Sequence, residues 1–304
     1  MEKLKAFEQY LFGDRGEEEY DLYDEEFWVD RLVVLPSIRP FELDKAVSLC
    51  TKYCNDDNFR RKLLGRIQKC PVLMYKLFKK GSFEYSEIET VLANGNSYIS
   101  CYYFRHEILN FEVFLEEKIK PDDLDESFLE NMDDIGVLIE YGYLPSSLEY
   151  CLKYDDIENF RKINILDGQA AKWSPFEWSY KPDSLGLLSF SGFFGSFHCF
   201  KYLLVNGYNI DDNVKSLIVC SGSLDLFHLC HENSELLAQS LFKAIEFFRL
   251  SEISFFIENG IQINKKMNNL LTPLHIAAQK GHLCVVENLL ARGSDIKAYD
   301  KDIE

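Results

Sequence analysis

The feature that most constrains the fold is an internal repeat near the C-terminal end of the chain. The segment FFIENGIQIN at 255–264 matches NLLARGSDIK at 288–297, and Gly260 and Gly293 are separated by 33 positions. A fixed period of this length indicates stacked structural units, because each unit alone leaves a hydrophobic face exposed to water. The sequence therefore predicts a repeat array.

Earlier segments carry the same skeleton in a degenerate form. The segment GSFHCFKYLLVNGYNI at 195–210 aligns with GHLCVVENLLARGSDI at 281–296, and their glycine, apolar and Leu-Leu positions coincide. The segment SSLEYCLKYDDIENFRKI at 146–163 reproduces the last unit position by position. In the unit before the last one, Phe248 stands at the position of Gly281. We therefore expect the array to extend toward the N-terminus with less regular units.

Each unit is predicted to be a pair of antiparallel helices. In the last unit Thr272 and Pro273 begin the first helix, because Thr can cap a helix and Pro suits its first turn. Gly281 ends that helix, and Gly293 permits the left-handed turn that closes the second one. The apolar stripe of the second helix is predicted at Leu283, Val286, Leu289 and Leu290.

These residues resemble a known repeat. TPLHIAAQKGH followed by VVENLLARGSDI is similar to the ankyrin repeat, although Leu270 stands where the turn of that family usually has glycine. The segments WSPFEWSYKPDSLGLLSFSGFFGSFHCFKYLLVNG, VCSGSLDLFHLC and AIEFFRLSEISFFIENG further resemble a large family of protozoan-parasite proteins. In that family a divergent helical region of unknown function precedes regular ankyrin repeats. The resemblance covers roughly residues 30–300. It implies protein binding and brings no known enzymatic activity or catalytic residues.

The fold class that follows is an all-α, ankyrin-type solenoid of stacked antiparallel helix pairs, degenerate at its N-terminal side. Residues 1–120 are predicted to be a divergent helical region that caps the array, and a separate small helical domain is the alternative. Residues 121–265 are predicted to hold degenerate helix pairs, with an aromatic insertion at 164–183. Residues 266–304 contain the near-consensus repeat and the start of the next one.

Helical spacing is visible within the N-terminal region. The clearest helix is expected at 86–95, where Ser86 and Glu89 form a capping box and Gly95 ends the helix. Residues 44–54 and 60–70 show comparable apolar periodicity. The acidic run EEEYDLYDEEFW at 17–28 is interpreted as a solvated segment or part of the first helix, with a docking tail as the alternative.

Composition excludes several classes of partner and compartment. The net charge of −17 repels phosphate backbones, so we expect no nucleic-acid binding. Nine cysteines without a CxxC pair argue against disulfides and zinc ribbons, and favour a reducing compartment. No stretch is apolar enough for a membrane span and the N-terminus lacks the pattern of a signal peptide. The sequence predicts a soluble, cytoplasmic protein without membrane insertion.

Two groups of reactive side chains are candidate sites. The first group is His275, His282, Cys284 and Glu287. Their counterparts vary between sister units, which indicates a scaffold: His275 is expected to bond between neighbouring loops, and His282, aligned with Ser196 and Ser223, to cap its helix. The second group, His228, Cys230 and His231, is interpreted as a polar helix end. No phosphate-loop, nucleotide-fingerprint or hydrolase motif occurs. We expect no enzyme, no metal and no cofactor; the alternative is an enzyme or metal-dependent domain hidden in the divergent N-terminal region.

Partner contacts are expected on the concave face and the hairpin tips of the array. The family resemblance places Gln279 and Lys280 on that face, and the alignment transfers the positions to earlier units. The predicted partner-binding residues are Lys153, Tyr154, Phe193, Phe194, Glu246, Phe247, Asn268, Asn269, Gln279 and Lys280. The aromatic members form either an exposed apolar patch or inter-repeat core. The aromatic residues within 172–182 raise the same choice between a recognition surface and inward packing.

The C-terminal end of the array is predicted to lack a polar cap. The period places another threonine at position 305, directly after the last residue. A solenoid normally ends in a polar capping repeat. We therefore expect either further repeats or self-association at this end.

Overall fold

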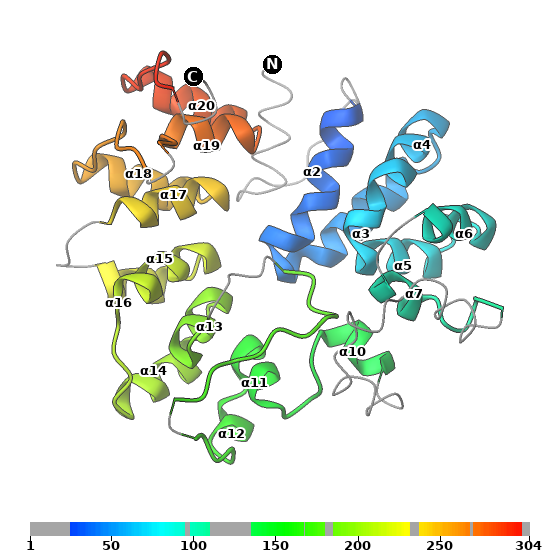
Figure 1. The fold of residues 1–304 in the computed structure, drawn as a ribbon, viewed down its shortest axis with the longest axis horizontal. Helices are drawn as coiled ribbons and strands as arrows, with labels where there is room; N and C mark the ends of the chain where they lie inside the picture. Colours follow the sequence, from blue (N-terminus) through cyan, green and yellow to red (C-terminus); the bar gives the residue numbers. More distant parts are fainter. Residues whose placement is uncertain are drawn as a thin grey trace. The chain divides into compact units, whose positions relative to one another are not determined.

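The computed structural model describes residues 25–94, 98–109, 135–166, 168–179, 185–231, 237–267 and 270–299. These residues form helices and turns, and apart from one isolated bridge between Ala170 and Gly186 they contain no β-structure. The chain divides into two compact units (Figure 1). The C-terminal unit contains Cys151–Lys172 and Pro182–Glu304, and the N-terminal unit contains Asp21–Tyr150 and Trp173–Lys181.

The C-terminal unit is built from helix pairs stacked in order. The first helix of each pair packs against the first helix of the next pair, and each second helix packs on its own first helix (Figure 1). The first helices are α13 (Leu187–Phe194), α15 (Asp212–Ser221), α17 (Ala238–Glu246) and α19 (Pro273–Gln279). The second helices are α14 (Phe197–Val205), α16 (Leu224–His231), α18 (Leu250–Glu258) and α20 (Leu283–Ala291). The predicted all-α stack of helix pairs is confirmed. An incomplete pair, α11 (Leu148–Tyr154) and α12 (Ile157–Phe160), precedes it.

Between the two helices of each pair, one residue of the turn has a left-handed backbone conformation. These residues are Asp155, Gly195, Gly222, Phe248 and Gly281, with φ between 52° and 79°. These five residues occupy the same position in the alignment of the repeat units. Phe248 therefore stands where Gly195, Gly222 and Gly281 stand in their own units. In four of the turns the next N–H donates to the carbonyl five residues earlier, as His282 does to Ala277 at 2.9 Å. This bond closes the first helix.

The last helix pair shows how local residues set helix ends. Thr272 caps α19, and Pro273 occupies its first position, as predicted. Gly293 has a φ of 90° and closes α20, also as predicted. The predicted apolar stripe was partly wrong: Val285 and Leu289 are the fully buried pair, Val286 is half-buried, and Leu290 is 39% exposed. Residues four apart share a helix face, and it is the face of Val285 that packs inward.

The helices of the N-terminal unit form two rows, and successive helices along the chain alternate between the rows. The first row is α2 (Glu25–Ile38), α4 (Asp57–Arg66) and α6 (Tyr85–Asn94), and the second is α3 (Leu43–Tyr53), α5 (Pro71–Lys79) and α7 (Tyr98–Tyr103). Each helix contacts the next member of its own row, and α2 also contacts α3. A further helix, α10, spans Ile135–Tyr141. Trp28, Phe59 and Phe104 are buried in this unit. The structure has helices at the three predicted places, 44–54, 60–70 and 86–95, which confirms these predictions. The second of them, α4, ends at Arg66, and a short 3-10 helix, Ile67–Lys69, follows it.

The predicted capping box of Ser86 and Glu89 is wrong. The helix begins one residue earlier, at Tyr85, and Glu87 accepts a hydrogen bond from the backbone N–H of Glu84 at 2.9 Å. Glu87 is also held by Arg60 from α4, an interaction between helices that the local pattern does not contain. Gly95 lies outside the described residues. The run at 17–28 is described only from Glu25 onward, where it forms the start of α2.

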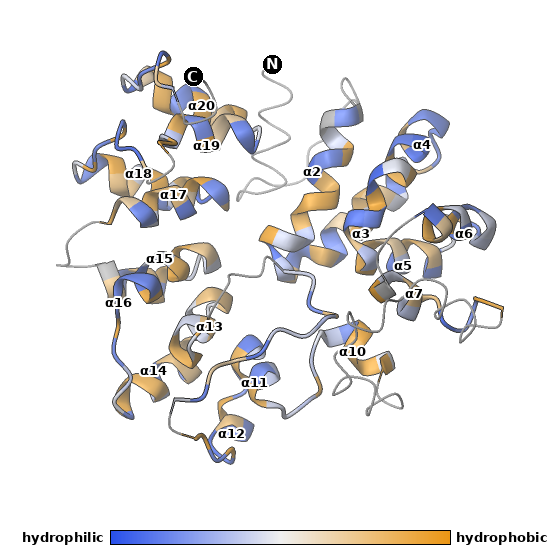
Figure 2. Ribbon diagram, in the orientation of Figure 1, coloured by the Kyte–Doolittle hydropathy of each residue, from blue (hydrophilic) through white to orange (hydrophobic). Residues whose placement is uncertain are grey.

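Hydropathy differs between the helices of the two units (Figure 2). Every residue of α13 is buried, because it packs against both its second helix and the next first helix. By contrast α4 buries only Phe59 and Leu63 and is coloured hydrophilic over much of its length (Figure 2). In the first three pairs of the stack, the first helix buries more of its residues than the second helix does.

Candidate partner-binding surface

The predicted partner-binding residues lie at the ends of the first helices, beside the left-handed turns. Lys153 and Tyr154 end α11, and Phe193 and Phe194 end α13. Glu246 and Phe247 stand at the end of α17, and Gln279 and Lys280 at the end of α19. Asn268 and Asn269 lie outside the described residues.

The aromatic members of this set are buried. Phe193 is 4% exposed, Phe194 7% and Phe247 1%, whereas Tyr154 is half-buried. The rings of Phe193 and Phe247 meet edge to face with centroids 5.9 Å apart. Between their two helices lies α15, which carries only Cys220 and Ser221 at the corresponding positions. The inter-repeat core is therefore the alternative that the burial supports, and these three phenylalanines do not form an exposed apolar patch.

Lys153 is also enclosed. Its side chain is 1% exposed, and its Nζ lies 5.1 Å from the ring centroid of Tyr154 and 5.7 Å from that of Phe194. A cation over an aromatic face is attracted by the negative charge density of the ring. Lys153 thus supports the aromatic core from the preceding unit.

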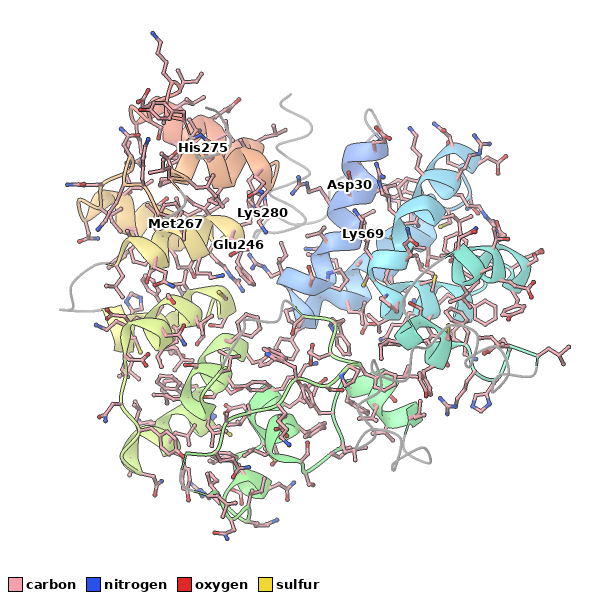
Figure 3. The ribbon with its side chains drawn as sticks, in the orientation of Figure 1. Asp30, Lys69, Glu246, Met267, His275 and Lys280 are labelled. Carbon is pink, nitrogen blue, oxygen red and sulfur yellow. The ribbon has the colours of Figure 1, made fainter. Side chains whose placement is uncertain are left out.

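Glu246 is the centre of a charged cluster that joins two repeats. Its Oε2 lies 2.8 Å from Lys243 Nζ on the same helix, and its Oε1 lies 3.0 Å from Lys280 Nζ at the end of α19 (Figure 3). Burial by itself would raise the pKa of Glu246, but the two lysines outweigh that effect and hold the pKa below its usual value. The Lys280 side chain is 38% exposed and Gln279 is exposed. The accessible part of the predicted surface is therefore polar.

A series of contacts between repeats was missed by the sequence analysis. The residue after the left-handed position donates a side-chain hydrogen bond to a carbonyl at the end of the preceding first helix. Ser196 Oγ donates to Leu152 O, Arg249 Nε to Cys220 O at 3.0 Å, and His282 Nε2 contacts Glu246 O at 3.4 Å. Such carbonyls have no partner inside their own helix. The signal in the sequence is a polar residue at this one position of each unit.

These contacts correct the expected capping roles. Ser196 and His282 stand at the N-cap positions of α14 and α20, but neither side chain caps its helix. Only Ser223 behaves as predicted, since its Oγ accepts from the N–H of Leu226 at 3.4 Å. The start of α14 is instead capped by Asp155 of the preceding turn, whose carboxylate accepts from His198 N and Cys199 N at 3.1 and 2.8 Å.

His275 was expected to bond between neighbouring loops, and this is wrong. Its Nδ1 accepts from the backbone N–H of Thr272 at 3.1 Å, which completes a capping box at the start of its own helix. The buried ring of His282 packs against the ring of Phe248 at a tilt of 53°, with centroids 4.8 Å apart. Over the described part of the chain, no three His, Cys, Asp or Glu side chains are placed to hold a metal ion. The side chain of His231 is outside that part.

The buried cysteines are poor nucleophiles. Burial raises the pKa of Cys54 and of Cys151 to about 11, and that of Cys70 to about 12. Burial also raises the pKa of Cys199 well above its usual value, with the Asp155 carboxylate adding to the shift. A thiol with such a pKa stays protonated near neutral pH, and the thiolate is the reactive form.

Within the aromatic stretch at 172–182, the described residues Phe176 and Trp178 pack inward in the N-terminal unit. Phe176 is buried against Tyr102 and Tyr103, and Tyr103 Oη donates to the carbonyl of Phe176 at 3.4 Å. Trp178 Nε1 donates to Pro40 O at 3.1 Å. Of the two readings of this stretch, these contacts support packing. Tyr180 lies outside the described residues.

In the described ranges, no helix has the length and apolar character needed to cross a membrane.

A comparison with known families agrees with the stacked helix pairs of the C-terminal unit. Residues 188–300 match the family model described as ankyrin repeats in three copies. The matched span runs from α13 to just past α20 and includes all the left-handed turns from Gly195 onward. This part of the chain therefore consists of ankyrin repeats.

Proposed function

We propose that the chain is a non-enzymatic scaffold that binds a protein partner through the ankyrin repeats of its C-terminal unit. The match of residues 188–300 to ankyrin repeats carries this proposal, because such repeats are protein-interaction modules. Stacked repeats present an extended surface that suits a macromolecule better than a small substrate. The buried, protonated thiols add no catalytic group.

The partner surface of this proposal is centred on the C-terminal pair of first helices. Gln279 and Lys280 supply accessible polar groups beside the largely buried Glu246. Asn268 and Asn269, which lie outside the described residues, belong to the proposed surface from the family resemblance alone. Lys153, Tyr154, Phe193, Phe194 and Phe247 stand at the equivalent ends of earlier first helices, where Lys153 and the three phenylalanines are buried and Tyr154 is half-buried. Because Lys280 already neutralises Glu246, a partner carboxylate that reaches Lys280 competes with an internal one. We expect the choice of partner to depend on whether its carboxylate can replace Glu246 as the ion-pair partner of Lys280.

A comparative pull-down tests the surface. Wild-type protein and the double variant Gln279→Arg, Lys280→Glu are used as baits in extract of the source cells, with Lys201→Glu on the exposed side of α14 as a matched control. We expect proteins captured by wild type and by the Lys201→Glu control to be lost from the double variant. Equal capture by all three baits would remove these residues from the binding surface.

The finer assignments rest on the sequence resemblance. We propose that the N-terminal unit is the divergent helical region of the protozoan-parasite family and that the protein acts in the cytoplasm. We also propose that the last repeat self-associates, supported by the exposure of Leu290, Ile296 and Tyr299 there. Light scattering on Ile296→Ser, Tyr299→Ser protein should show a smaller mass than wild type; a wild-type monomer at every concentration would contradict self-association.

A further inference from the structure

We draw no further inference here: the strongest candidate, the surface of the last helix pair where Ala278, Val286 and Leu290 are partly exposed while the aligned Ile245 and Ile253 of the preceding pair are buried, adds nothing to the self-association already proposed there, because nothing in the described part of the chain shows what covers it.

Discussion

Removing the Phe193 ring should strongly destabilise the C-terminal unit. Truncating a fully buried phenylalanine to alanine costs about 3–5 kcal/mol, and Phe193 is only 4% exposed. Part of that loss comes from Phe247, whose ring meets Phe193 edge to face at 5.9 Å. Such a pair contributes about 0.5–1.5 kcal/mol beyond its buried area. We therefore expect Phe193→Ala to cost about 3–4 kcal/mol, with a coupling of about 1 kcal/mol to Phe247→Ala.

Tryptophan fluorescence reports the unfolding of the N-terminal unit alone. Trp28, Trp173 and Trp178 all belong to the N-terminal unit, so their fluorescence follows that unit, while circular dichroism follows all helices. In urea titrations the Phe193→Ala variant should show an early loss of helical signal before the fluorescence transition. A cost below about 1 kcal/mol, as expected for a surface position, would refute the assignment of Phe193 to the inter-repeat core. A coupling near zero in the double-mutant cycle would refute the contact across α15.

Three further substitutions and one control substitution probe the turns and the charged cluster. Leu270 has a φ of 62°, so Leu270→Gly should stabilise the protein by roughly 1 kcal/mol, measured as a higher melting temperature; an unchanged or lower value would contradict strain at this turn. Gly222→Ala should destabilise by about 2–4 kcal/mol, because its Cβ would overlap Nη1 of Arg249 and displace that side chain from Cys220 O. Gly207→Ala, also at positive φ but in open space, is its control and should cost only about 1–2 kcal/mol in the same urea titration; equal costs would contradict the overlap. Glu246→Gln should destabilise the protein near neutral pH. Because the folded pKa of Glu246 is lowered, its contribution is complete above the ordinary glutamate pKa and is lost as pH falls through the folded value. The stability difference from wild type should therefore shrink in acid, and a difference that grows in acid would contradict the ion pairs.

Features repeated along the chain could be predicted from the sequence. The alignment placed Phe248 at a glycine position, and the backbone is left-handed there despite the bulky side chain. Thr272 and Gly293 were predicted because helix ends depend on a few neighbouring residues. The stacking of helix pairs followed from the period and from the apolar positions that recur with it.

Features set by neighbouring repeats could not be predicted. His282 begins a helix, but its side chain contacts the Glu246 carbonyl of the preceding repeat, a contact that depends on the spacing of the stack. The end of α13 could have presented Phe193 outward, and only the small residues Cys220 and Ser221 on the next helix let its ring meet Phe247.

The most direct test of the scaffold function is site-specific photocrosslinking in the source cells. A photoreactive amino acid replaces Gln279, which is exposed at the end of α19, or Lys201 on the exposed side of α14 as a control. We predict a discrete covalent adduct with another protein from position 279 and none from position 201. Adducts from position 201 alone, or none from either position, would contradict partner binding through the ends of the first helices.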